Sequence, residues 1–206
     1  MDLYLNKFEF QLKTLIKNIN LNIPEGFIYL GFIGYKDLYD KDLGDEYIDE
    51  GFTANHELIE KVIKDIQPDG GKDIPEDIAG AFKLGLNKKW EGKVKIAILF
   101  TDSPCHGRKY HDLNQTLPDE KDDRIDDNEN NNIEDLIKKF VEKNISLFCV
   151  ELHNNTNKMF HIFEDIYNGA KINNENCEFC VVKKNICDPK IIRKITELYN
   201  KIMINE

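Results

Sequence analysis

Three short apolar runs constrain the fold of this chain more than any other feature. They occupy residues 27–35, 94–101 and 145–152. Each run is too short for a typical helix, and apolar side chains dominate at successive positions instead of alternating with polar ones. This pattern is typical of strands that are buried on both faces of a sheet. The sequence therefore predicts a sheet covered on both sides.

Amphipathic segments separate these runs. In residues 4–19, for example, Phe8, Leu12 and Leu15 fall on one helical face. Buried strands that alternate with such helices predict an α/β fold with a doubly wound, mostly parallel sheet and helices on both faces. We expect one domain over residues 1–206, with helices near residues 4–19, 56–66, 75–87, 133–143, 156–167 and from 188 onward, a shorter strand at 178–182 and a short edge hairpin within 37–51.

The charge of the chain limits its partners. A formal net charge of -10 argues against binding nucleic acid or anionic membrane surfaces, and it is compatible with cations and basic proteins. No apolar run is long enough to cross a bilayer, and the first residues lack a secretory pattern. The cysteine count is odd, and Cys149 lies inside an apolar run. These features predict a cytoplasmic protein with reduced thiols.

Much of the acidic excess lies in one stretch, residues 119–129. It belongs to a longer segment, 112–132, which is polar and has no periodicity, so we expect a mobile acidic loop there. The stretch lacks the glycine and the terminal glutamate that a calcium loop requires. The sequence therefore predicts a solvated acidic face.

Several candidate binding residues follow the apolar runs. In doubly wound sheets ligands bind beyond the carboxyl ends of the strands. Asp37 follows the first run, and Asp102 and Ser103 follow the second. A carboxylate at such a position needs a cation or several donors, or else it caps the following turn, and both interpretations stay open. Asp73, with Glu76 three residues later, matches a helix capping box. This structural role is sufficient to explain the aspartate at position 73.

Two groups of sulfur and imidazole side chains also require an interpretation. Cys105, His106 and His111 could form a thiol–base pair or part of a zinc site, but neighbouring residues on an extended chain point apart. We therefore favour a role in ordering the loop. The lone CxxC at 177–180, even with Cys187 and His161 not far away, is a weak zinc signal, and core or surface thiols explain it better.

Several spaced blocks resemble one known family. The strings GGKDIPEDIAGAFKLGL and ILFTDSPCHGRKYHD, with Trp90 between them and GFIGYKD upstream, resemble the von Willebrand factor type A domain of the kind associated with alpha-protein kinases. The resemblance implies a Rossmann-like fold and a Mg²⁺ site at the carboxyl edge of the sheet. By position, Asp102 matches the family's carboxylate after the fourth strand, and Asp73 matches its middle-loop ligand.

The family's D-x-[ST]-x-S element is absent from this sequence, and Met1 falls where the group's version of that motif ends. The resemblance therefore implies that the natural protein begins upstream and that this chain lacks the first, central strand. We expect a vacant slot between residues 27–35 and 94–101, an incomplete metal site, and weak or absent Mg²⁺ binding in this chain.

These features predict a protein-interaction or regulatory module and not a self-contained enzyme. Its acidic edge, with Asp37, Asp73 and Asp102, would receive a protein partner with or without a bridging metal. The alternative is a fragment of an alpha-type serine/threonine kinase that carries only the non-catalytic A-type domain, because the sequence has no Gly-rich phosphate cradle with an associated lysine. A thiol or zinc hydrolase built on Cys105 and His111 is a third hypothesis.

Overall fold

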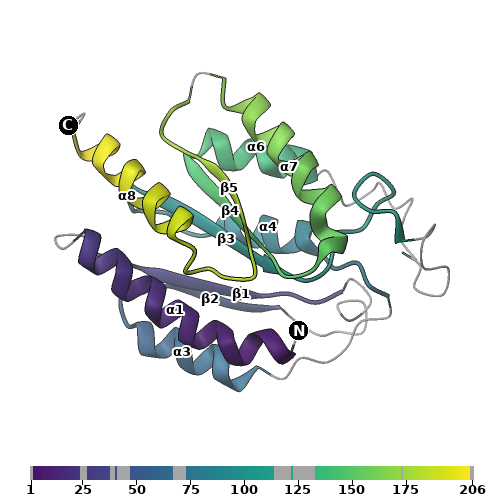
Figure 1. Cartoon of the computed structure of the whole chain (residues 1–206), viewed down its shortest axis with the longest axis horizontal. Coiled ribbons are helices and arrows are strands. Elements are labelled where there is room, and N and C mark those ends of the chain that lie inside the picture. The colour runs from purple at the N-terminus through teal and green to yellow at the C-terminus, as the bar shows by residue number, and fades with distance from the viewer. Residues whose placement is uncertain are drawn as a thin grey trace.

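The computed structural model describes residues 2–23, 27–37, 40, 47–66, 73–113, 122, 133–172 and 174–204. Helices and strands alternate along the chain, as the apolar runs predict (Figure 1). The elements are α1 (Asp2–Asn22), β1 (Leu30–Gly34), β2 (Ile48–Thr53), α3 (His56–Asp65), α4 (Ile78–Asn87), β3 (Lys95–Thr101), α6 (Ile133–Glu142), β4 (Ile145–Glu151), a 3₁₀ turn (Asn154–Thr156), α7 (Asn157–Ala170), β5 (Phe179–Lys183) and α8 (Pro189–Ile204).

Three of the strands form a parallel sheet in the order β3-β4-β5. The register pairs Lys95 with Ile145 and continues without a break to Thr101 and Glu151. β4 lies between two neighbours, and each of its residues is buried. The predicted α/β class with a parallel sheet is therefore confirmed.

The strand β1 belongs to a separate sheet. It pairs antiparallel with β2, so Phe32 lies opposite Glu50 and Gly34 opposite Ile48. An edge hairpin is expected within residues 37–51, but β2 at the end of that stretch pairs with β1 instead, and much of the stretch lies outside the described residues. The strand at 27–35 is shorter than predicted. Among the described residues, no ladder of hydrogen bonds joins β1 to β3.

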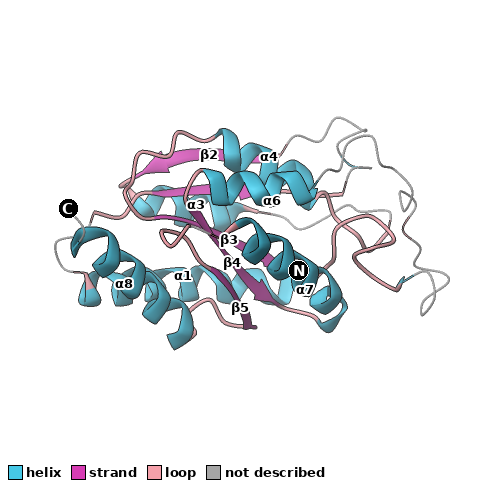
Figure 2. Ribbon diagram, turned by 90° about the horizontal axis from the view of Figure 1, so that it is seen from above, coloured by secondary structure: helices cyan, strands magenta, loops and turns pink. Residues whose placement is uncertain are grey.

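Two apolar cores lie on the two faces of the parallel sheet. Leu147 and Cys149 pack into the core that includes α4, α6 and α7, whereas Phe148 and Val150 pack into the core that includes α1, α3 and α8. This alternation is the period-2 geometry of a strand. Figure 1 shows the strands between these two groups of helices, and Figure 2 shows the same elements from above. Helices therefore cover both faces, as predicted.

The start of α4 differs from the prediction. The capping box assigned to Asp73 and Glu76 is wrong, because the helix begins at Ile78 and its N-cap is Asp77. The Asp77 carboxylate accepts a hydrogen bond from the Gly80 amide at 2.7 Å, and the Tyr47 hydroxyl also donates to it. Residues 73–76 consequently lie outside the helix, where they are available to the edge of the sheet.

Most of the predicted acidic loop, 112–132, lies outside the described residues. Asp122 is one exception, and it contradicts the prediction of a solvated face. Its side chain is buried, with 3% of the residue exposed. A network with two histidines accounts for this burial and is described below.

Candidate functional site at the carboxyl edge

The segment at residues 73–77 connects the ends of β1 and β3. The Asp77 amide donates to the Lys36 carbonyl oxygen at 3.2 Å, just beyond β1. The Glu76 amide donates to the Pro104 carbonyl oxygen at 3.0 Å, just beyond β3. These contacts bring the carboxyl ends of both strands and the predicted Asp73 to the same edge of the molecule, called the rim below.

Two of the predicted acidic residues gather there around a histidine. Ligand atoms of Asp37, Asp73 and His106 all lie within 4.8 Å of one another. Asp37 and His106 are buried, whereas Asp73 is half-buried. A group of two carboxylates and an imidazole has the composition of a cation site. The metal role predicted for Asp73 and Asp102 stays a prediction.

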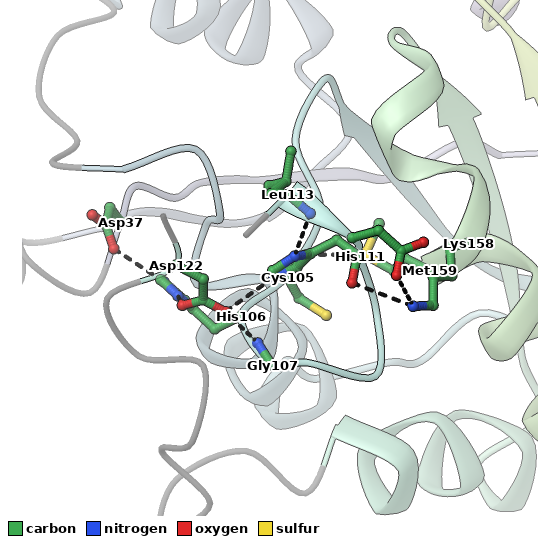
Figure 3. Close-up of polar contacts among 10 residues, drawn as sticks. Asp37, Cys105, His106, Gly107, His111, Leu113, Asp122, Lys158 and Met159 are labelled. Atoms are coloured by element: carbon green, nitrogen blue, oxygen red, sulfur yellow. Dashed lines mark hydrogen bonds and ion pairs between the residues drawn. The ribbon is translucent and has the colours of Figure 1, made fainter. Parts of the chain in front are cut away.

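His106 lies between two carboxylates (Figure 3). Its Nε2 is 3.1 Å from Asp37 Oδ1, and its Nδ1 is 2.8 Å from Asp122 Oδ1. Burial alone would lower the pKa of this imidazole, but the hydrogen bonds to Asp122 and Asp37 outweigh burial and raise the pKa to about 9. The ring is therefore a cation at neutral pH, and it has no lone pair to offer a metal.

Asp122 is the residue of this network that sequence reasoning missed. It accepts hydrogen bonds from the Gly107 amide at 2.8 Å and from His111 Nε2 at 3.0 Å, in addition to the bond from His106. Burial opposes ionisation of this carboxyl, but the hydrogen bonds from the two histidines prevail and hold its pKa well below the usual range. One carboxylate thus ties together the whole turn that carries His106, Gly107 and His111.

Glu76 is a second rim residue that the sequence did not indicate as a ligand. Burial, and after it the charges of Asp37 and Asp102, raise its pKa to about 8. Glu76 therefore carries its proton for most of the time at pH 7. Its Oε2 atom is buried and has no hydrogen-bond partner among the described residues. Burial is the larger cause of this shift, and the neighbouring carboxylates add to it, so negative charges lie close together at the rim.

Asp102 and Ser103 lie at the end of β3 as predicted. The Ser103 hydroxyl is 3.5 Å from Asp102 Oδ1, and the Ser103 amide donates to the Thr101 hydroxyl at 3.2 Å. Asp102 is half-buried and lines one cavity together with Asp73 and Glu76. It is close enough for its charge to affect Glu76, but it is not part of the group formed by Asp37, Asp73 and His106.

Cys105 points away from the two histidines (Figure 3). Its side chain is buried in the core that also includes Tyr110 and Phe163, and its amide contacts Met159 Sδ at 3.1 Å. Burial raises the pKa of the thiol well above its ordinary value. A buried thiol without a contacting base is a poor nucleophile. The geometry thus supports a loop-ordering role for this turn and gives no support to a thiol–histidine pair.

The CxxC cysteines do not converge. Cys177 lies in the core under α6 and α7, whereas Cys180 lies in the core under α1 and α8. Burial raises the pKa of both thiols. Cys187 donates from Sγ to the Gln11 carbonyl oxygen at 2.8 Å, and His161 is exposed. The thiols of Cys177 and Cys180 therefore pack in two different hydrophobic cores and do not converge on one site.

The comparisons with known proteins give a distant likeness. No family model matches the chain. The chain is 26% identical, over 168 residues, to the alpha-protein kinase vwkA of Dictyostelium discoideum. The matched region is 80% of this chain and 25% of that protein, so the chain spans about a quarter of its relative's length. No helix of the described residues is long and apolar enough to cross a membrane.

Proposed function

We propose that this chain is a protein-interaction module of the von Willebrand A type whose acidic rim receives a cationic group of a partner. The observation that carries the proposal is the concentration of carboxylates at one edge. Asp37, Asp73 and His106 lie together, and the nearby Glu76 has a pKa of about 8 because burial, and after it the charges of its carboxylate neighbours, oppose its ionisation. An incoming cation would relieve this repulsion.

Two kinds of cation suit the rim to different degrees. Mg²⁺ prefers oxygen ligands in octahedral geometry. The protonated His106 cannot contribute a ligand, and Asp37 already pairs with it. Asp73 and Asp102 would therefore hold Mg²⁺ with water in the remaining positions, which makes the site incomplete. When bound, the ion would supply an open position for a partner's carboxylate. A lysine or arginine of the partner suits the same carboxylates directly.

Calorimetric titration with MgCl₂ tests the metal part of the proposal. We expect binding weaker than about 1 mM, because few protein oxygens are available. Asp73→Asn and Asp102→Asn should each reduce the remaining signal, whereas Asp165→Asn on the exposed face of α7 should leave it unchanged. Tight binding, or binding that survives both rim substitutions, would contradict the proposed incomplete site.

Binding of a short lysine-rich peptide, followed by fluorescence anisotropy at low salt, tests the second part. Asp73→Asn and Asp102→Asn should each weaken it several-fold relative to Asp165→Asn. Equal affinity for all three variants would show that only the overall charge of the chain attracts the peptide, and the proposed rim site would then fail.

The alternative candidate is the non-catalytic piece of an alpha-type protein kinase. The likeness to alpha-protein kinase vwkA favours it. The two candidates agree about the module itself and differ about the longer protein. We expect no ATP turnover from this chain, and turnover that Asp102→Asn abolishes would contradict both.

A further inference from the structure

A basic surface lies at the end of the molecule opposite the rim. The segment at residues 87–95 carries four lysines and one glutamate, although the whole chain has a net charge of -10. This segment begins where α4 ends and continues into β3. Because β3 starts at Lys95 and ends at Thr101 beside the rim, and a strand rises about 3.3 Å per residue, the basic surface and the rim are about 20 Å apart.

The end of α6 adds to this surface. α4 and α6 cover the same face of the parallel sheet (Figure 1). Lys143, just after α6, donates from Nζ to the Leu86 carbonyl oxygen at 3.0 Å, and Lys95 donates from Nζ to the Lys143 carbonyl oxygen at 3.4 Å. These bonds hold the end of α6 against the segment at 87–95. The exposed lysines of this surface, called the basic end below, are Lys89, Lys93, Lys139 and Lys143.

Helix capping accounts for only part of this charge. Cations near a helix C-terminus stabilise the helix, and Lys95 and Lys143 serve in this way through their bonds to carbonyl oxygens. Lys89 is different, because its side chain is 90% exposed and its contact is an ion pair with the exposed Glu91. Such surface pairs contribute little to stability. The charge of Lys89 is therefore accessible to a partner.

The rim carries the matching charge. Asp73 and Asp102 are half-buried there, and the proposed function has them receive a cationic group, which a lysine provides. The net charge of -10 argues against nucleic acid or an anionic membrane as the ligand of the basic end. Repulsion between two whole copies is limited, because charges more than about 8 Å apart are largely screened at physiological ionic strength. A second copy of the chain can therefore supply the lysine.

We propose that the partner of the rim is a second copy of this chain, which presents its basic end, so that copies associate head to tail. This inference rests on the proposed function, since it names the partner of the same site. The contact uses different surfaces of the two copies, so a pair still offers one rim and one basic end and can grow into a chain. Exposed ion pairs are individually weak, so we expect a Kd on the order of 100 µM.

Sedimentation velocity from about 10 µM to about 1 mM measures this association. We expect the sedimentation coefficient of the unsubstituted chain to rise with concentration. Lys89→Glu/Lys139→Glu reverses two charges of the basic end and should weaken association at least tenfold. The matched control, Lys61→Glu/Arg193→Glu, reverses two exposed charges on α3 and α8 and should associate as the unsubstituted chain does. A monomeric unsubstituted chain at every concentration, or equal association of the two variants, would overturn the proposal.

Mixing two variants identifies the head-to-tail contact. Asp73→Asn/Asp102→Asn weakens the rim and keeps the basic end, whereas Lys89→Glu/Lys139→Glu keeps the rim. We expect each variant alone to associate at least tenfold more weakly than the unsubstituted chain. An equimolar mixture should form a dimer and nothing larger, because only one of the two possible contacts remains. A mixture that stays monomeric, or a rim variant that associates as the unsubstituted chain does, would overturn the proposal.

Peptide binding separates this inference from the proposed function. If the lysine-rich peptide binds the rim but copies do not associate, the rim receives a different partner and only this inference fails. If the peptide does not bind the rim either, the proposed function fails as well. Binding of a glutamate-rich peptide to the basic end of a chain that stays monomeric would assign that surface to an acidic segment of another protein, and it would likewise overturn the inference.

Discussion

The buried Asp122 carboxylate predicts a large and specific loss of stability when it is removed. It accepts hydrogen bonds from His106, His111 and the Gly107 amide at 2.8–3.0 Å. Breaking a buried ion pair by removing one partner costs about 3–5 kcal/mol, because the other charge is left uncompensated. Asp37 still faces His106, so we expect Asp122→Ala to cost about 3 kcal/mol. Asp122→Asn keeps the shape and should cost less.

The same network predicts how stability depends on pH. The folded-state pKa of His106 is raised from 6.5 to about 9, so its contribution is fully present below pH 6.5 and is lost as the pH rises through 9. This rise corresponds to about 3 kcal/mol. The folded-state pKa of Asp122 is lowered, so its contribution is present above its ordinary value of 3.8 and is lost as the pH falls through the folded-state value.

Urea unfolding between pH 5 and 9.5 measures the loss of stability, and NMR titration of the imidazole resonances measures the pKa of His106 directly. Asp112→Ala is the matched control, since Asp112 lies in the same loop but pairs with Lys158 while 52% exposed. It should cost less than about 1 kcal/mol. A His106 pKa at or below 6.5, or an Asp122→Ala cost no greater than that of the control, would refute the reasoning.

Three further predictions follow from the geometry. Glu76→Gln should stabilise the chain by about 1 kcal/mol at pH 8, because the raised pKa makes ionisation of Glu76 in the folded chain costly above pH 4.5, and partial exposure reduces this effect. Urea unfolding measures it, and a loss of stability with rising pH that is identical in the variant and the unsubstituted chain would contradict the prediction. Gly80→Ala should destabilise the chain by about 2 kcal/mol, because the added Cβ would clash with Asp77 Oδ2. Gly85→Ala should stabilise the chain by about 0.5–1 kcal/mol, because alanine has the higher helix propensity. Thermal unfolding that ranks the two variants in reverse would contradict the assigned cap. Alkylation by iodoacetamide in the folded chain should be slow at the buried Cys105 and fastest at the half-buried Cys187, and rapid loss of Cys105 that depends on His111 would revive the thiol hydrolase.

The sequence predicts the strands and helices well because their apolar patterns are strong. The runs at 94–101 and 145–152 become β3 and β4 almost to the residue, and their parallel pairing follows from the helix between them. The separation of β1 from β3, which the family resemblance implied, also agrees with the pairing among the described residues. Long-range apolar periodicity is thus sufficient for the layers of this fold.

Local polar contacts are less predictable, because several acidic residues compete for the same role. Asp73 and Asp77 both precede the helix, and Asp77, which is the cap, also accepts a hydrogen bond from Tyr47, thirty positions earlier in the chain. Asp122 stands in a run of charged residues, and nothing local distinguishes it from solvated neighbours. Only the fold brings it against His106 and His111. The predicted Asp37, Asp73 and Asp102 do lie near the rim, and whether they bind a cation stays a proposal.

Residue-resolved amide exchange of the free chain tests the split sheet most directly. In a strand with one parallel neighbour, alternate amides point to the unpaired side, so protected and fast-exchanging amides should alternate along β3 (Lys95–Thr101). In β4, Leu147 to Val150 have neighbours on both sides and should all exchange slowly. Uniformly slow exchange along β3 would mean that another strand already occupies that edge, and it would contradict this account.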